Sequence, residues 1–293
     1  MPTSTLWPVF VLIASGLQVA RNAAQRELTA RLGLWGATYV RFLFGLPFAL
    51  LWTTVIVSWR GFSGGPDLAF VLWVLVGAAT QAGATAGVVF AMRGRAFAVA
   101  TAFTKTEVLG TALVGVALIH DVITPGDWLG IALGTLGILL MARVSPTREA
   151  FHAALGGIAA GVQFSFSSVA YRASALEWGG DPWVGAAMSL TSTLLVQAVC
   201  GGVLMLIFAR PALKIMLRAW RPCLVPGAAG GISSAFLFTA FAIGPSAGAV
   251  KALQLIDVII AWGVSHRLFA ERIRVGEMLG IALILAGALA IVL

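Results

Sequence analysis

A few charged and amide side chains lie inside otherwise apolar stretches of this sequence. Lys251, Gln254 and Asp257 follow one another at intervals of three residues within one such stretch. On a helix this spacing places all three side chains on one face. An ionisable group at the centre of a bilayer costs about 3 kcal/mol on insertion scales, so its presence indicates a function. A cation and an acid on one face predict a site that binds a carboxylate, a phosphate or an amine, or that takes up a proton.

A second apolar stretch, 97–119, carries a related polar face. Thr101, Thr104 and Glu107 occupy the positions 150 residues before the three residues of the later stretch. Both polar faces therefore end in an acid. Lys105 lies near the Thr101 side of this face but almost opposite Glu107 on the helical wheel. We therefore do not expect Lys105 and Glu107 to pair with each other.

Two interpretations of these polar faces remain open. In the first, they line a polar cavity in which Lys251 binds an anionic group, while Glu107 or Asp257 binds an amine or a proton. In the second, the acids pair with Arg41 or Lys251 and serve only to hold helices together. Polar side chains that bond between helices are common in membranes.

Further polar side chains recur at helical spacing elsewhere. Gln163, Ser167 and Tyr171 are each four residues apart, and Gln81 precedes Thr85 by four residues. Such side chains can either line a cavity or bond to a neighbouring helix. Under the cavity interpretation, the candidate substrate-binding residues are Lys251, Gln254, Asp257, Glu107, Gln81, Thr104, Gln163 and Tyr171.

Composition places the whole chain in a membrane. Of its 293 residues, 60% are hydrophobic and 10% are charged, whereas soluble domains average about 45–50% apolar and about 25% charged. The net charge of +8 comes from basic residues that stand singly between apolar runs. These residues fit loops that face the cytoplasm or anionic lipid, and they exclude nucleic acid as a partner.

Ten segments are long and apolar enough to cross a bilayer, which takes about 20 residues. Lipid-exposed spans are helices or closed barrels, and runs this long without strict alternation exclude a barrel. The predicted fold class is therefore an all-α membrane protein. The predicted transmembrane helices are 5–22, 34–58, 68–92, 97–119, 125–143, 152–172, 182–209, 219–242, 246–265 and 275–293.

The sequence contains an internal repeat. Without a gap, residues 90–140 match residues 240–290 at 14 of 51 positions, and the matches include several glycines. We interpret residues 1–145 and 146–293 as two copies of a five-helix unit. Two tandem units with an odd number of spans insert with opposite orientation. Inverted repeats of this kind are typical of transporters, whose substrate site lies between the halves near the membrane midplane.

The distribution of Lys and Arg predicts the orientation. Fourteen of them, counting Arg21 and Arg143 at helix ends, are assigned to the loops after the first, third, fifth, seventh and ninth helices. Arg60 and, at the last residue of the sixth helix, Arg172 are assigned to loops on the other side. Cytoplasmic loops are enriched in Lys and Arg. This pattern places both termini on the non-cytoplasmic side of an inner (plasma) membrane.

Catalytic motifs are absent from the sequence. It contains no HExxH, no G-x-S-x-G, no P-loop and no Rossmann fingerprint, and Cys200 and Cys223 form no metal-binding spacing. We therefore predict that the protein is not an enzyme and uses no cofactor or metal. Without a nucleotide-binding loop, transport depends on a gradient of protons or of another solute. The expected partners are a small-molecule substrate and the lipid bilayer, and the sequence leaves the oligomeric state open.

These features together resemble the drug/metabolite transporter superfamily, EamA type. The resemblance is carried by residues 37–42 in the second predicted helix and by the ends of the two halves, 120–130 and 270–280. It implies a basket of ten helices around a central cavity, with the fifth and tenth helices at the periphery. It also implies export or exchange of amino acids, related metabolites or drugs by alternating access, and the aromatic amino-acid exporters are plausible relatives. Many members have both termini in the cytoplasm, which is the opposite of the orientation predicted from the arginines.

Two other functions fit the same sequence. One is multidrug or cation efflux by the same fold. The other is a membrane sensor or assembly protein that transports nothing and whose polar faces only join helices.

Overall fold

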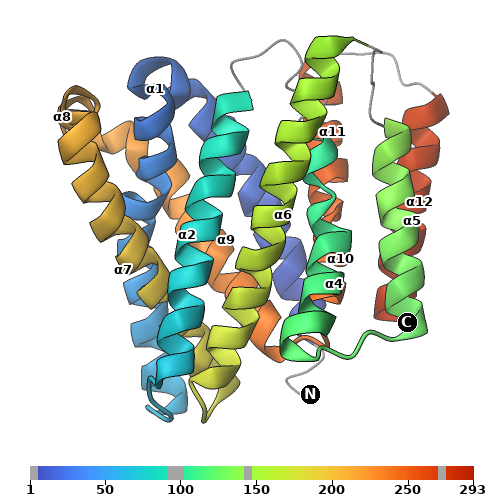
Figure 1. Ribbon diagram of the computed structural model, residues 1–293, viewed down its shortest axis with the longest axis horizontal. Coiled ribbons are helices and arrows are strands. Elements are labelled where there is room, and N and C mark those ends of the chain that lie inside the picture. The colour runs from blue at the N-terminus through green and yellow to red at the C-terminus, as the bar shows by residue number, and fades with distance from the viewer. Residues whose placement is uncertain (1–5, 92–101, 142–146, 270–274) are drawn as a thin grey trace.

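The computed structural model describes residues 6–91, 102–141, 147–269 and 275–293, and this part of the chain contains helices and no strand (Figure 1). The helices stand side by side and run between two opposite ends of the bundle. They are α1 Trp7–Arg60, α2 Leu68–Ala91, α4 Glu107–Ile119, α5 Pro125–Met141, α6 Arg148–Glu177, α7 Pro182–Phe208, α8 Arg210–Arg218, α9 Trp220–Ile243, α10 Ala247–Gln254, α11 Ile256–Phe269 and α12 Val275–Val292.

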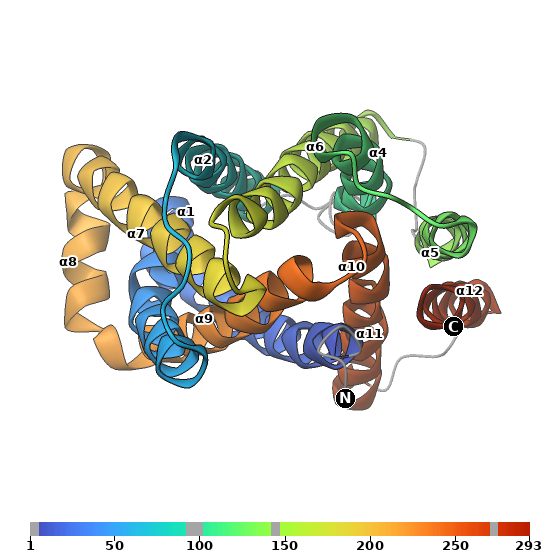
Figure 2. The ribbon, with the colours of Figure 1, turned by 90° about the horizontal axis from the view of Figure 1, so that it is seen from below.

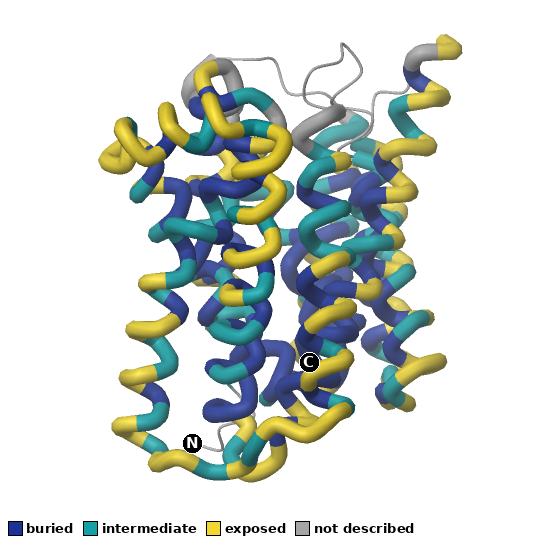
Figure 3. Tube along the Cα trace, turned by 60° about the vertical axis from the view of Figure 1, so that its left-hand side comes forward, coloured by how far each residue is buried: buried dark blue, intermediate teal, exposed yellow. Residues whose placement is uncertain are grey.

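Length and composition identify the bundle as membrane-embedded. Most of the apolar helices are long enough to cross a bilayer, and two others, Pro125–Met141 and Gly276–Val292, are shorter. Exposed residues follow the outer faces of the helices (Figure 3). Many of them are large and apolar, such as Phe208, which is 73% exposed. A surface of this kind is stable in lipid but not in water. The chain is an all-α, multi-pass membrane protein. The residues that the structure describes contain seven candidate spans, which are Trp35–Arg60, Leu68–Val88, Ala102–Ile119, Ala150–Glu177, Pro182–Phe208, Trp220–Ile243 and Ala247–Val264.

The first helix, α1, is two helical segments joined at Gly33. This residue has φ 67° and ψ −173°, a backbone conformation that glycine adopts with little strain. We predicted a loop over residues 23–33, and this prediction is wrong because the helix continues to residue 32. Leu28 and Leu32 are buried, and the Gln25 side chain donates to the carbonyl of Ala37 at 2.7 Å. These contacts fold the second segment back along the first.

The sixth predicted transmembrane helix ends before the observed helix does. We expected it to end at residue 172, whereas α6 continues to Glu177. Arg172, which we assigned to a loop, is therefore inside a helix and is 8% exposed. Its side chain donates hydrogen bonds to Asp121 and to backbone carbonyls. These acceptors replace the water that a loop residue would contact.

A short helix, α8, occupies a segment that we predicted to be a loop. Pro211 lies in its first turn, where the missing N–H costs no hydrogen bond. Arg210, Lys214 and Arg218 recur every four residues along one face, while Met216 is fully buried. This amphipathic pattern fits a helix that lies at the membrane interface.

Helix packing follows a paired pattern (Figure 2). The helix α1 packs along α9 and α7, α2 along α6, and α4 along α6 and α10. The helices α5 and α12 pack against each other at one edge of the bundle. Figure 1 places the start of α1 and the end of α12 on the same side, opposite α8.

Glycines set the close approach of α5 and α12. A Cβ atom added at Gly130 would lie 2.7 Å from the carbonyl oxygen of Gly287, and one added at Gly137 would lie 2.6 Å from that of Gly280. The earlier glycine of α5 meets the later glycine of α12, so the two helices are antiparallel. Small residues of this kind allow backbones to approach closely in lipid.

We expect Gly137→Ala to lower the free energy of unfolding by about 1–3 kcal/mol, because the added methyl group forces the two helices apart. Gly156→Ala in α6 is the matched control, since nothing lies within 4 Å of a Cβ at that position. Alanine is the better helix former, so the control should be neutral or slightly stabilising. Thermal unfolding in detergent micelles measures both variants. Equal effects of the two substitutions would contradict the close contact.

Candidate functional site

Two helices are interrupted at equivalent points of the proposed repeat. The N–H of Lys105 donates to the carbonyl of Ala102 at 3.1 Å, and the N–H of Leu255 donates to that of Ala252 at 3.2 Å. Each of these bonds spans three residues instead of the four of an α-helix. The two interruptions are 150 residues apart, the same offset that aligns the sequence repeat.

The second interruption corrects one prediction. We expected Lys251, Gln254 and Asp257 on one continuous helical face. Instead, Lys251 and Gln254 belong to α10, whereas Asp257 lies in the first turn of α11. Glu107 likewise lies in the first turn of α4. An acidic side chain is favourable at this end of a helix because the backbone N–H groups carry partial positive charge there.

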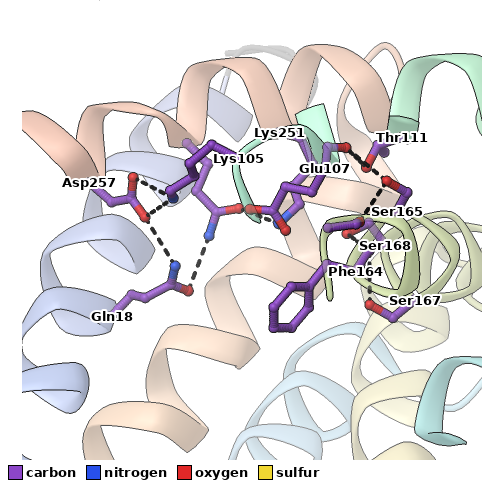
Figure 4. A network of polar contacts seen from close by, with 12 residues as sticks. Gln18, Lys105, Glu107, Thr111, Phe164, Ser165, Ser167, Ser168, Lys251 and Asp257 are labelled. Atoms are coloured by element: carbon purple, nitrogen blue, oxygen red, sulfur yellow. Dashed lines mark hydrogen bonds and ion pairs between the residues drawn. The ribbon is translucent and has the colours of Figure 1, made fainter. Parts of the chain in front are cut away.

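The two interruptions are joined by a continuous series of polar side chains (Figure 4). Lys105 Nζ lies 2.7 Å from Asp257 Oδ2 and 3.0 Å from Oδ1. Gln18 Nε2 donates to the same Oδ2 at 3.2 Å. Gln254 Nε2 then donates to Gln18 Oε1 at 3.2 Å. Asp257 is thereby connected to α1 and α10.

The series continues to the other acid. Lys251 Nζ donates to Gln254 Oε1 at 3.0 Å and lies 3.2 Å from Glu107 Oε2. The backbone carbonyl of Glu107 accepts bonds from Thr111 and Ser165 at 2.6 and 3.1 Å. We call the six linked residues the polar chain; they are Lys105, Asp257, Gln18, Gln254, Lys251 and Glu107.

The polar chain contains two reciprocal ion pairs between the halves of the sequence. Glu107 pairs with Lys251, and Asp257 pairs with Lys105. Lys105 and Glu107 thus find partners other than each other, as their positions on the helical wheel led us to expect. The side chains are 8–15% exposed, so each charge depends on its partner for the stabilisation that water would otherwise provide.

Gln18 and Lys105 are the members of the polar chain that were not among the predicted substrate-binding residues. Gln18 is an isolated amide among apolar residues of the first predicted helix, with Ser15 three residues before it. Its carbonyl accepts from Gln254 and its amide donates to Asp257, so it bridges the two parts of the interrupted helix. The only signal in the sequence was an amide within an apolar segment.

Other candidate residues form a second polar group between α2, α6 and α7. Gln197 Nε2 donates to Gln81 Oε1 at 2.9 Å and to the carbonyl of Ala78 at 3.1 Å. Tyr171 donates to the carbonyl of Gly77 at 3.4 Å and stacks on Phe238 at a centroid distance of 4.1 Å. We did not predict Gln197 as a candidate from the sequence.

The remaining candidates have different surroundings. Thr104 is buried beside Lys105 at the first interruption. Gln163 is partly exposed, and its amide donates to the carbonyl of Ala159 in its own helix at 3.4 Å. Thr101 lies outside the described residues.

Two arginines add positive charge to the interior. We expected Arg21 in a loop, but it lies in α1, is 8% exposed and donates to Asn22 Oδ1. The helix continues past this position, so its side chain is enclosed by the bundle. Arg41 donates to Thr85 Oγ1 at 3.0 Å and lies 5.3 Å from the ring centre of Phe42.

Comparison with known proteins establishes the fold alone. No protein-family model and no curated protein sequence matches the chain. Among solved structures, 27 chains match. One of them, named only "Crystal structure of protein", superposes with a TM-score of 0.70 at 18% sequence identity, over 98% of this chain and 94% of its own length. The two proteins share their architecture over nearly their whole lengths.

Proposed function

We propose that this protein is a secondary transporter, an exporter or exchanger, that moves small organic solutes across the membrane by alternating access. The polar chain carries this proposal. It places two acids and two lysines in the interior of an apolar bundle, where uncompensated charge is costly. It is built across two interrupted helices, the kind of element that forms substrate and ion sites in transporters.

The same proposal includes ten spans in two inverted halves. The parts of α1 before and after Gly33 count as two spans, and α10 and α11 count as one interrupted span. The helix interruptions at 105 and 255 support the duplication. The reciprocal glycine contacts of α5 and α12 support opposite orientation, because a two-fold axis exchanges Gly130 with Gly280 and Gly137 with Gly287. The boundary between the halves, 1–145 and 146–293, falls at residues 142–146, outside the described part.

We place the protein, on its sequence resemblance, with the EamA-type drug/metabolite transporters, whose substrates include amino acids and related metabolites. Its orientation follows from the charged residues. Arg31 and Arg148 are exposed. The turn within α1, the start of α6 and the helix α8, which carries Arg210, Lys214 and Arg218, lie at the same end of the bundle (Figure 1). We propose that this end faces the cytoplasm and that both termini lie on the other side.

A second candidate function is a membrane sensor or assembly protein that transports nothing. One observation favours it: the members of the polar chain bond to one another. Glu107 pairs with Lys251, as the interpretation of helix packing predicted. Transport measurements separate the two functions, because a sensor with a purely structural polar chain moves no solute.

The test is a solute-uptake screen in proteoliposomes with a preset pH gradient. We expect transport by the wild type, and Lys251→Ala and Asp257→Asn should each lower the rate at least about tenfold by removing a charge from the polar chain. Arg60→Gln is the control, since Arg60 lies at the periphery with its side chain 26% exposed. If both interior variants transport a confirmed solute with unchanged rate and pH dependence, the proposed site is wrong. If no solute in the screen is transported, the sensor function is favoured.

A further inference from the structure

Arg21 and Arg41 lie opposite each other in the two segments of α1. The bond from Gln25 to the carbonyl of Ala37 fixes the register of these antiparallel segments. Arg21 is four residues before Gln25 and Arg41 is four residues after Ala37. Each arginine is therefore one helical turn from this bond. The two arginines are thus at the same level of the bundle, where their positive charges repel each other and the charge of Asp257 attracts Arg21.

Neither arginine forms a direct ion pair with a carboxylate in the described part of the chain. Arg21 bonds to Asn22 and Arg41 bonds to Thr85, and both of these partners are neutral. The four buried carboxylates there are already engaged. Asp257, Glu107 and Asp121 pair with Lys105, Lys251 and Arg172, and Asp127 accepts bonds from Thr124.

The charges of the interior therefore do not cancel. The polar chain has two lysines and two acids and is neutral. Asp257, whose charge acts on Arg21, is already paired with Lys105, so Arg21 and Arg41 add two positive charges that have no ion-pair partner among the described residues. Two like charges held together inside an apolar bundle destabilise the protein without a counterion.

The two arginines lie next to the polar chain and next to the second polar group, which contains Gln81, Gln197 and Tyr171 and is called the Gln81–Tyr171 group. Arg21 lies one turn from Gln18 on the same face of α1, and Gln18 belongs to the polar chain. Arg41 bonds to Thr85, which follows Gln81 by one turn of α2. A ligand held at the arginines is thus next to the polar chain on one side and to the Gln81–Tyr171 group on the other.

We propose that Arg21 and Arg41 bind an anionic group, a carboxylate or a phosphate, of the transported solute. This inference rests on the proposed transport function and specifies its substrate class as small organic anions or zwitterions. Guanidinium groups suit this role because their paired N–H donors match the oxygens of either anion. The earlier expectation that Lys251 binds the anion is replaced, because Lys251 is already engaged by Glu107 and Gln254.

Ligand binding to the purified full-length protein in phosphatidylcholine nanodiscs tests this proposal. The probes are inorganic phosphate, phenyl phosphate, phenylacetate and the neutral analogue phenylacetamide. We expect at least one anion to raise the melting temperature of the wild type in a concentration-dependent manner, and phenylacetamide to have a smaller effect. Arg21→Gln and Arg41→Gln should each weaken anion binding at least about tenfold, because each removes charge-assisted hydrogen bonds.

Two further measurements keep the result interpretable. Without any anion, Arg21→Gln should melt at the same temperature as the wild type or higher, since it removes an unbalanced charge. Arg60→Gln should leave anion binding unchanged. Equal stabilisation by anion and amide, or anion binding that survives both interior substitutions, would overturn the proposal.

The source of the anion and the transport function are tested separately. If only added phosphatidylglycerol stabilises the protein through Arg21 and Arg41, and no soluble anion does, the site binds lipid and the proposal is wrong. If the proteoliposome screen finds a neutral or cationic substrate whose transport is unaffected by Arg21→Gln and Arg41→Gln, the anion site fails while the transport function stands.

Discussion

Lys251→Met is expected to lower the free energy of unfolding by about 3–5 kcal/mol and to abolish transport. The substitution leaves Glu107 without its cation, although that side chain is only 10% exposed, and removing one partner of a buried ion pair strands a desolvated charge. It also breaks the polar chain, because Gln254 loses the donor to its Oε1 atom. Unfolding followed by circular dichroism in detergent micelles measures the stability, and the proteoliposome assay measures transport.

A double variant separates the stability effect from the functional one. Adding Glu107→Gln to Lys251→Met removes the stranded charge, so much of the lost stability should return, while transport should remain absent. The two substitutions should therefore be strongly non-additive in a double-mutant cycle. Additive losses of stability would show that these two side chains are not coupled, against the 3.2 Å contact between them. Restored transport in the double variant would show that the pair serves only packing.

The fold class could be predicted from sequence because bilayer physics acts on local composition. Apolar length alone identified most of the helices, including α7 from Pro182 and α9 to within one residue of each end. The break within α1 could not be placed from the sequence. Residues 23–32 are polar enough to form a loop, and their helix is maintained by contacts such as the burial of Leu28, which only the tertiary structure supplies.

The site was partly predictable for a similar reason. An acid inside an apolar stretch can be recognised from sequence alone, so Glu107 and Asp257 could be named as candidates. The partner of Asp257 could not be, because pairing depends on how α4, α10 and α11 approach one another. Asp257 pairs with Lys105 from a stretch about 150 residues earlier, and Gln18 joins them from α1. Arg21 was assigned to a loop because local composition does not show where a helix continues.

Arg172→Met is expected to destabilise the protein by about 3–5 kcal/mol, since it leaves another buried acid without its cation. Arg172 Nε lies 2.8 Å from Asp121 Oδ1. Its other nitrogens donate to the carbonyls of Phe241, Gly244 and Pro245. The second oxygen of Asp121 accepts from the N–H of Ala247 at 2.7 Å.

These bonds fasten the turn between α9 and α10 to α6 at the end of the bundle opposite α8. Aromatic side chains close the same end: Trp178 packs edge-on against Phe62 and Phe70, and Trp183 does so against Phe10 and Trp59. Because α10 carries Lys251 and Gln254, a change in the turn moves two members of the polar chain. Under the proposed alternating access, one end of the bundle opens while the other stays closed, and the Arg172–Asp121 pair would hold this end closed.

The matched control for Arg172→Met is Arg60→Gln. Arg60 and Asp181 form an ion pair near the same end of the bundle, but the contact is 3.6 Å and both side chains are 26% exposed. Exposed pairs contribute little, so this variant should lose less than about 1 kcal/mol. Closure is measured by maleimide labelling of Ala247→Cys in a Cys200→Ser background: position 247 is fully buried, and its labelling should rise only when Arg172 is also replaced. If labelling is equally slow with and without Arg172→Met while stability falls, the pair fastens the fold but does not control access to the interior.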